Sequence, residues 1–314
     1  MSAAAPPERV LFAPPMTARS NRGIALLSVL WITGLLAAVA ASFASTSHTE
    51  MRLAHNHKEN AKAEALADAG VHRAAFKLLE LELETAWHGG GTLYAFSLGE
   101  GDVQVQIEDE DGKIDLHGAP LQLLAGLFVA LGLPEEDAQA MADRIGDFRD
   151  EDSEPEPFGA EDEAYLEAGL LRGAADRPLA TESELLRVLG MTQSLYEQVR
   201  PYVTIHSGAE GIDVTRASRP VLEALPGIAP ATVEALLNAD PEVDPYSLVD
   251  DEPLLDLGIY LVPSRDLVFT IRALGRTSSG GQFLRQAVIE LDVSRNPPFL
   301  VYKWSRGALP ETAG

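Results

Sequence analysis

The first informative feature of the chain is a long apolar stretch near its N-terminus. From Ile24 to Ala44 the sequence runs 21 residues without a charged side chain. A helix of that length spans about 30 Å, the thickness of the hydrocarbon core of a bilayer. Three arginines and one glutamate precede it, and positive flanking charge favours the cytoplasmic side. The pattern predicts one membrane-spanning helix with a cytoplasmic N-terminus.

The helical pattern continues beyond the apolar stretch. Residues 50–84 contain no proline and a single glycine, Gly70. Apolar residues recur there at spacings of mostly three or four, which is typical of one face of a helix. That predicted face consists of Leu53, Ala61, Ala65, Ala69, Phe76, Leu79 and Leu83. We predict one helix of about 60 residues, and Gly70, which costs about 1 kcal/mol relative to alanine, leaves its continuity open.

Alternation of apolar and polar residues predicts strands in two separated regions. The first strand is Val103–Ile107, after a glycine-rich flexible break at 87–91. The later strands are 267–274, 283–293 and 299–304, with a hairpin loop at 277–281. The residues between the two regions have a mainly helical pattern. The fold class is therefore α+β: a long N-terminal helix, an antiparallel sheet, and a large helical insert between the strands.

The helical region contains an internal repeat. Residues 114–119 (IDLHGA) match residues 212–217 (IDVTRA) at an offset of 98 residues. Each copy reads as a short extended segment followed by a helix, which predicts two small helical subdomains. The second copy continues into LPGIAP at 225–230, which resembles a helix-hairpin-helix that can present backbone N–H groups to a DNA phosphate.

Charge argues against nucleic acid as a partner. The chain has 24 Lys+Arg against 48 Asp+Glu, a formal net charge of -24, and no lysine or arginine lies between Arg219 and Arg265 around the hairpin. A phosphate site there would work against the local field, so we interpret the hairpin as structural. Cysteine is absent, which excludes disulfides, thiolate metal sites and a cysteine nucleophile. Since common catalytic motifs are also missing from the sequence, we predict no enzymatic activity.

Metal binding is the chemistry that the sequence favours most. Residues 147–163 (DFRDEDSEPEPFGAEDE) contain nine acidic residues and one arginine. Calcium takes six to eight oxygen ligands with flexible geometry, and an irregular loop can supply them. On composition alone, a solvated acidic loop is the commoner explanation of such a run.

The N-terminal residues resemble the type IV pilins and type II secretion pseudopilins. Arg22-Gly23-Ile24 followed by an apolar helix is similar to the prepilin peptidase site of that family, with cleavage between Gly23 and Ile24. Most members carry glutamate at the fifth mature position, where this chain has Ser28. That departure resembles the minor pseudopilin K family of the general secretion pathway. Translation from Met16 would give a leader of eight residues.

The resemblance also implies a division of the chain and a ligand set. The implied parts are a leader at 1–23, the transmembrane part of the helix at 24–49, a periplasmic helix with the first strand at 50–107, a helical insert that is SAM-like and helix-hairpin-helix-like at 108–262, and the remaining strands at 263–314. Carried over position by position, the acidic segment resembles the family's calcium-binding segment. The implied ligands of a structural calcium ion are Asp150, Asp152, Glu161 and Asp162, with Asp147 as a further candidate.

The function implied by the resemblance is that of a minor pseudopilin at the tip of the type II secretion pseudopilus. Its implied partners are the minor pseudopilins I and J, the prepilin peptidase and a secreted protein substrate. The chain would span the inner membrane once, with its C-terminal domain in the periplasm, and would initiate the pseudopilus. Two alternatives stay open: a membrane-anchored DNA-uptake protein that uses the hairpin, and a soluble binding protein released from a signal sequence.

Overall fold

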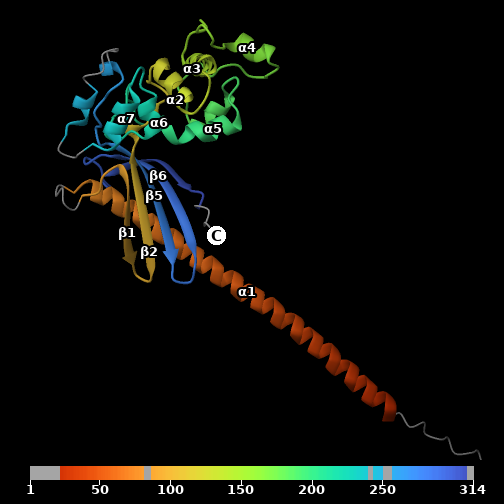
Figure 1. Ribbon diagram of the computed structural model, residues 1–314. Helices are drawn as coiled ribbons and strands as arrows, with labels where there is room; N and C mark the ends of the chain where they lie inside the picture. The colour runs from red at the N-terminus through yellow and green to blue at the C-terminus, as the bar shows by residue number, and fades with distance from the viewer. Residues whose placement is uncertain (1–21, 81–85, 240–242, 250–256, 310–314) are drawn as a thin grey trace, which may run out of the picture. The chain divides into compact units, whose positions relative to one another are not determined.

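The computed structural model describes residues 22–80, 86–239, 243–249 and 257–309 (Figure 1). The chain divides into two compact units, residues 1–58 and 59–314. The helices are α1 (Arg22–Leu78), α2 (Leu121–Ala130), α3 (Glu135–Arg149), α4 (Asp162–Glu167), α5 (Gln193–Val199), α6 (Arg219–Glu223) and α7 (Pro230–Leu237). The strands are β1 (Gly90–Leu98), β2 (Gly101–Asp109), β3 (Ile114–Asp115), β4 (Val203–Thr204), β5 (Val268–Thr277), β6 (Gln282–Leu291) and β7 (Phe299–Arg306). Short 3-10 turns are η1 (Glu110–Gly112), η2 (Glu182–Arg187), η3 (Arg200–Tyr202), η4 (Pro245–Leu248) and η5 (Leu257–Ile259).

The N-terminal unit contains the apolar part of α1. In the described part of the chain, one helix is long and apolar enough to cross a membrane, Ile24–Leu78. The side chains of its apolar window are exposed, as lipid-facing side chains would be. At the position where most pilins carry glutamate, the Ser28 hydroxyl donates a hydrogen bond of 2.9 Å to the carbonyl of Ile24 one turn earlier. That bond satisfies the only polar group of the side chain within the helix itself.

In the second unit, α1 is continuous across Gly70 and packs on the sheet. A Cβ on Gly70 would stand 2.8 Å from Cγ1 of Val103 and 2.9 Å from Cβ of Ala273, so this glycine allows the helix to approach the sheet closely. The face of α1 predicted from the sequence was wrong at most of its described positions, although Leu79 packs against the sheet core, and Leu83 lies outside the described residues. Leu53, Ala61, Ala65 and Phe76 are exposed, and the buried face consists of Ala63, Ala67, Gly70, Val71, Ala74 and Ala75. Small residues form the closest contact because they permit the short distance, and Leu66, Leu78 and Leu79 pack against the same core while partly buried.

The sheet is antiparallel with the strand order β1-β2-β5-β6-β7. The strands predicted in the C-terminal region are present as β5, β6 and β7, and the Thr277 N–H donates to the Gly281 carbonyl at 2.9 Å in the β5–β6 hairpin. The glycine-rich segment was predicted to be a flexible break, and this was incorrect at its end, because β1 begins at Gly90. Since β1 is an edge strand whose residues are mostly exposed, it lacks the strong alternation that reveals a half-buried strand.

The helical segments lie between β2 and β5 in the chain and enclose a hydrophobic core of their own. The internal repeat has a matching geometry in its two copies. Ile114 pairs in parallel with Val203, and Ile212 forms a parallel bridge with Leu261. The aspartate that follows each isoleucine accepts backbone N–H groups through its carboxylate: Asp115 from His117 at 2.7 Å, and Asp213 from Thr215 at 2.6 Å. The repeated Ile-Asp pair therefore starts the first copy with a short strand and the second with a single parallel bridge, and each is followed by a side-chain-capped turn.

Candidate metal centre

The acidic segment is held between two helices of the helical region. α3 ends at Arg149, so Asp147 lies in its last turn and Asp150 directly follows it, while Glu161 immediately precedes α4. α4 is fixed by Tyr165, which is 1% exposed, packs 6.5 Å from the ring of Phe148 and accepts a hydrogen bond from the Leu189 N–H at 3.1 Å. These contacts bring the two ends of the acidic segment together.

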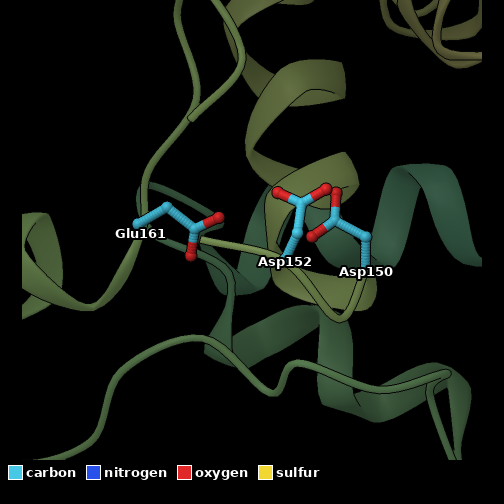
Figure 2. A group of neighbouring side chains, drawn as sticks. All are labelled: Asp150, Asp152 and Glu161. Carbon is cyan, nitrogen blue, oxygen red and sulfur yellow. The ribbon is translucent and has the colours of Figure 1, made fainter. Parts of the chain in front are cut away.

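Three of the five predicted ligands converge at this place. Asp150, Asp152 and Glu161 each offer one carboxylate oxygen, and these oxygens all lie within 4.8 Å of one another. Figure 2 shows Asp150 and Asp152 side by side, with Glu161 reaching toward them from the facing segment. Asp150 and Glu161 are half-buried and Asp152 is exposed. The cluster thus faces solvent on one side.

Several carboxylate oxygens near the cluster lack a hydrogen-bond partner in the described structure. They are Oδ1 of Asp150, Oε1 of Glu161 and Oδ2 of Asp147, and all three atoms are buried. Burial, followed by the charges of Asp147 and Asp150, raises the pKa of Glu161 to about 7. Burial also raises the pKa of Asp150 and of Asp147. Buried acceptors without donors are costly, and a bound cation would satisfy all of them.

The residues present therefore fit a hard divalent cation. Calcium prefers oxygen ligands in flexible arrangements, and the site offers three carboxylates with uncommitted oxygens. A lysine or arginine side chain could also neutralise these carboxylates. Arg149, the arginine of this segment, instead donates to the carbonyls of Leu116 (2.5 Å) and Ala119 (2.8 Å). The arrangement could bind a metal ion and tie the segment to α3.

The two other predicted ligands, Asp147 and Asp162, lie outside the group of three. Asp147 is fully buried, and its Oδ1 accepts the backbone N–H of Glu156 at 3.0 Å. Asp162 starts α4, and its carboxylate lies against Gly173, where a Cβ would stand 1.6 Å from Oδ1. The structure thus buries Asp147 beside the cluster, and Asp162 lines the same cleft as Glu161 while it contacts Gly173.

Two further aspartates contribute to the site and were missed by the sequence analysis. Asp143, one turn before Asp147 on α3, is 2% exposed and accepts the Phe158 N–H at 3.2 Å through Oδ2, which anchors the acidic segment. Asp176 lies 14 residues past Asp162, lines the same cleft as Glu161, and its charge contributes to the raised pKa of Glu161. The distances of these two aspartates from the acidic run along the sequence match no metal-binding motif. Asp143 lies one helical turn before Asp147, so the periodicity of α3 could have indicated it.

The hairpin considered for DNA binding joins α6 and α7. Gly227 in its turn has a φ of 73°. Arg219 at its start pairs with Glu234 of α7 at 2.6 Å and with Glu223 at 3.8 Å. This arginine is therefore engaged within the hairpin itself and links its two helices.

A long N-terminal helix packed on an antiparallel sheet, with helical segments between the strands, defines a pilin-like protein. The family model "Type II secretion system (T2SS), protein K" matches residues 105–208. Over these residues the chain is similar to the type II secretion system protein K family.

Curated relatives and a solved structure agree with this family. Type II secretion system protein K of Pseudomonas aeruginosa is 29% identical over 243 residues, which cover 70% of this chain and 73% of the relative. Type II secretion system protein K of Klebsiella pneumoniae is 29% identical over 206 residues, or 58% of this chain and 62% of the relative. The fold is similar to that of a chain in the crystal structure of the GspK-GspI-GspJ complex from enterotoxigenic Escherichia coli, with a TM-score of 0.55 and 23% identity, covering 84% of this chain and 100% of that chain.

Proposed function

We propose that this chain is a minor pseudopilin that assembles with minor pseudopilins I and J at the tip of the type II secretion pseudopilus. There it would initiate the pseudopilus and support export of folded proteins across the outer membrane. The observation that carries the proposal is the family match together with the pilin-like helix and sheet. The structural relative was solved in a complex with GspI and GspJ, which supports the choice of partners. The proposed role is assembly rather than catalysis.

The proposal includes a single membrane crossing in the inner membrane, with the domain after α1 in the periplasm. Prepilin peptidase would cleave between Gly23 and Ile24, at the start of α1. A helix without a buried carboxylate needs no charge partner from a neighbouring subunit inside the bilayer. Ser28, which is bonded to its own helix, is therefore consistent with the outermost position in a fibre.

Processing is tested by co-expressing the full chain with a prepilin peptidase and measuring the mass of its N-terminal peptide. We expect the mature N-terminus at Ile24 and its loss when the peptidase is omitted. Gly23→Leu should block cleavage, whereas Gly34→Ala, which has open space around it in α1, serves as the control. A mature N-terminus beyond Ala44 would instead identify a cleaved signal sequence.

Assembly is tested by co-purifying the full chain in detergent with tagged minor pseudopilins I and J. We expect a complex of defined stoichiometry that withstands high salt, because apolar helix faces would form much of its contact area. A major pseudopilin serves as the comparison partner. If the chain binds none of them, or retains DNA instead, the assignment to the pseudopilus tip is wrong.

We propose in addition that calcium binds at Asp150, Asp152 and Glu161, with Asp147 and Asp162 as further candidates. The ion would be structural and would close the acidic segment against α3. The converging carboxylates and their buried unpartnered oxygens support it. The test is calorimetric titration of the chelated protein with Ca²⁺, where 1:1 or higher stoichiometry is expected, and Mg²⁺ is the comparison because it prefers stricter octahedral geometry.

A further inference from the structure

A cleft lies on the face of the sheet that is turned away from α1. Strand residues alternate between the two faces, so Ile271 and Ala287 pack toward α1 while Arg272 and Gln286 point to the other side. Residues of the helical region complete the cleft from above the sheet. Its lining includes Lys113, Tyr196 and Arg200 from that region, and Thr270, Arg272, Gln286, Lys303 and Ser305 from the sheet.

The cleft gathers positive charge in a strongly acidic chain. Its lining includes four cationic side chains, Lys113, Arg200, Arg272 and Lys303, and two acidic ones, Glu110 and Glu182, whereas the net charge of the whole chain is -24. Arg306 also borders the cleft, but its guanidinium lies over the ring of Phe283, 5.2 Å from the centroid. The four cations come from parts of the sequence far apart, so only the folded chain brings them together.

Acidic neighbours hold three of these cations in place, and the two lysines keep N–H donors that can bind another acceptor. Lys113 lies 2.5 Å from Glu110 and 3.7 Å from Glu108, and Lys303 lies 3.2 Å from Glu182. An ammonium group has three N–H donors, so each lysine retains capacity for a further acceptor. Arg272 pairs with Glu108.

Arg200 is the uncommitted cation of the cleft. It is exposed, begins η3, and has no ion pair or side-chain hydrogen bond within the described ranges. A guanidinium has five N–H donors in a planar fork that matches a carboxylate. The cleft thus combines one free arginine with two lysines that are already held in place.

We propose that this cleft binds an acidic peptide segment of a partner protein. A carboxylate ligand fits because it can accept from Arg200 and from the remaining N–H groups of Lys113 and Lys303. The rest of this acidic chain repels such a segment, so the cleft restricts where it can bind. This inference does not depend on the position of the chain in a pseudopilus, because it concerns a site on the folded domain.

The probe is a fluorescein-labelled octaglutamate peptide, titrated with the full chain in detergent and followed by anisotropy at low salt. We expect Arg200→Gln to weaken binding about five- to tenfold, since it removes charge-assisted hydrogen bonds whose contribution is reduced by the exposure of Arg200. Lys303→Gln should weaken it similarly, and octaglutamine should not bind. Arg172→Gln removes an exposed arginine outside the cleft and is the matched control.

Three outcomes would overturn the proposal. One is unchanged affinity of the Arg200→Gln and Lys303→Gln variants, provided that their thermal midpoints equal that of the parent. Another is an equal loss with Arg172→Gln, which would indicate general charge attraction. The third is a dimer in sedimentation that Arg200→Gln dissociates, which would assign the cleft to a second copy of this chain.

Discussion

The Cα of Gly159 lies against the carboxylate of Asp147. A Cβ at position 159 would stand 1.9 Å from Oδ2 of Asp147 and 2.6 Å from its Cγ. Asp147 is fully buried, and Oδ2 is the oxygen without a hydrogen-bond partner within the described residues. Glycine at 159 therefore lets the acidic segment close over a buried carboxylate of α3.

The first prediction follows from that contact. Gly159→Ala would push the Asp147 carboxylate or the segment aside, because no Cβ fits at this distance. We expect calcium affinity to fall about 10- to 100-fold, as for changes that misplace metal-site residues. Isothermal titration measures the effect. Phe158→Ala is the control, since it alters the neighbouring residue, 52% exposed, without adding an atom near Asp147. Equal calcium affinities of both variants would contradict the prediction.

The second prediction separates two effects of the carboxylate cluster. Without metal, Asp150 and its acidic neighbours repel one another, so Asp150→Asn should leave the chelated protein as stable as the parent or more stable. With calcium, the parent should gain about 2.7 kcal/mol at a free concentration 100-fold above its dissociation constant, and the variant should gain much less. Thermal unfolding with and without chelator measures both effects.

The control for this experiment is Glu151→Gln, which removes a charge from an exposed residue between two cluster members. It should retain the calcium-dependent stabilisation. If Asp150→Asn retains that stabilisation as well, the cluster does not bind the ion.

The sequence predicted the elements whose periodicity is strong and local. The apolar helix and the strands β5 to β7 show their periods directly in short windows. β1 escaped prediction because edge exposure removes its alternation. The buried face of α1 was misassigned because hydrophobicity favours Phe76 and Leu53, whereas the contact with the sheet requires small residues such as Ala63. Packing distance, which decides this face, is not visible in a hydrophobic pattern.

The candidate metal centre was predictable only in part. Asp150, Asp152 and Glu161 belong to one acidic run, so a local motif indicates them. Asp176 lies on a later loop that folds back to line the same cleft, and its distance along the sequence does not reveal this. The cationic cleft is still harder to predict from the sequence. Lys113 and Lys303 are 190 positions apart, and they line one cleft only because β7 forms the edge of the sheet beside the helical region.

The third prediction concerns the contact between α1 and the sheet. Gly70→Ala should favour the helix by about 1 kcal/mol through propensity, yet its Cβ would overlap Val103 and Ala273. Overpacking costs about 1–3 kcal/mol, so we expect net destabilisation of about 1 kcal/mol in chemical unfolding. The double variant with Val103→Ala should recover part of the loss, because Cγ1 of Val103 is the nearest atom. If Gly70→Ala is instead more stable than the parent, the space between α1 and the sheet can accept a methyl group, and the prediction is wrong.

The fourth prediction concerns Asp109, a buried carboxyl where β2 meets the helical region. It is 3% exposed, its Oδ1 accepts the Asp111 N–H at 2.9 Å, and its Oδ2 accepts the Ser264 hydroxyl at 2.6 Å. Burial is the main cause that raises its pKa to about 6, although both hydrogen bonds lower it and the charges of Asp111 and Asp266 raise it further. The folded protein therefore binds this proton more tightly than the unfolded chain, whose ordinary value is 3.8.

The sign of the pH effect follows from linkage. A pKa raised in the folded state stabilises the fold fully below about pH 3.8, and this contribution is lost as the pH rises through about 6. Asp109→Asn cannot titrate, and the amide can still bond to Asp111 and Ser264. We expect the variant to gain stability relative to the parent between pH 4 and 7, by up to about 3 kcal/mol, in urea unfolding at a series of pH values.

The matched control for Asp109→Asn is Asp292→Asn. Hydrogen bonds from Ser294, followed by Arg295, lower the pKa of the half-buried Asp292, so its charged form stabilises the fold. That contribution is present above the ordinary value of 3.8 and disappears as the pH falls through the lowered pKa. The stability of Asp292→Asn relative to the parent should thus decrease as the pH rises, opposite to Asp109→Asn. If both variants shift in the same direction, burial does not govern the titration of Asp109.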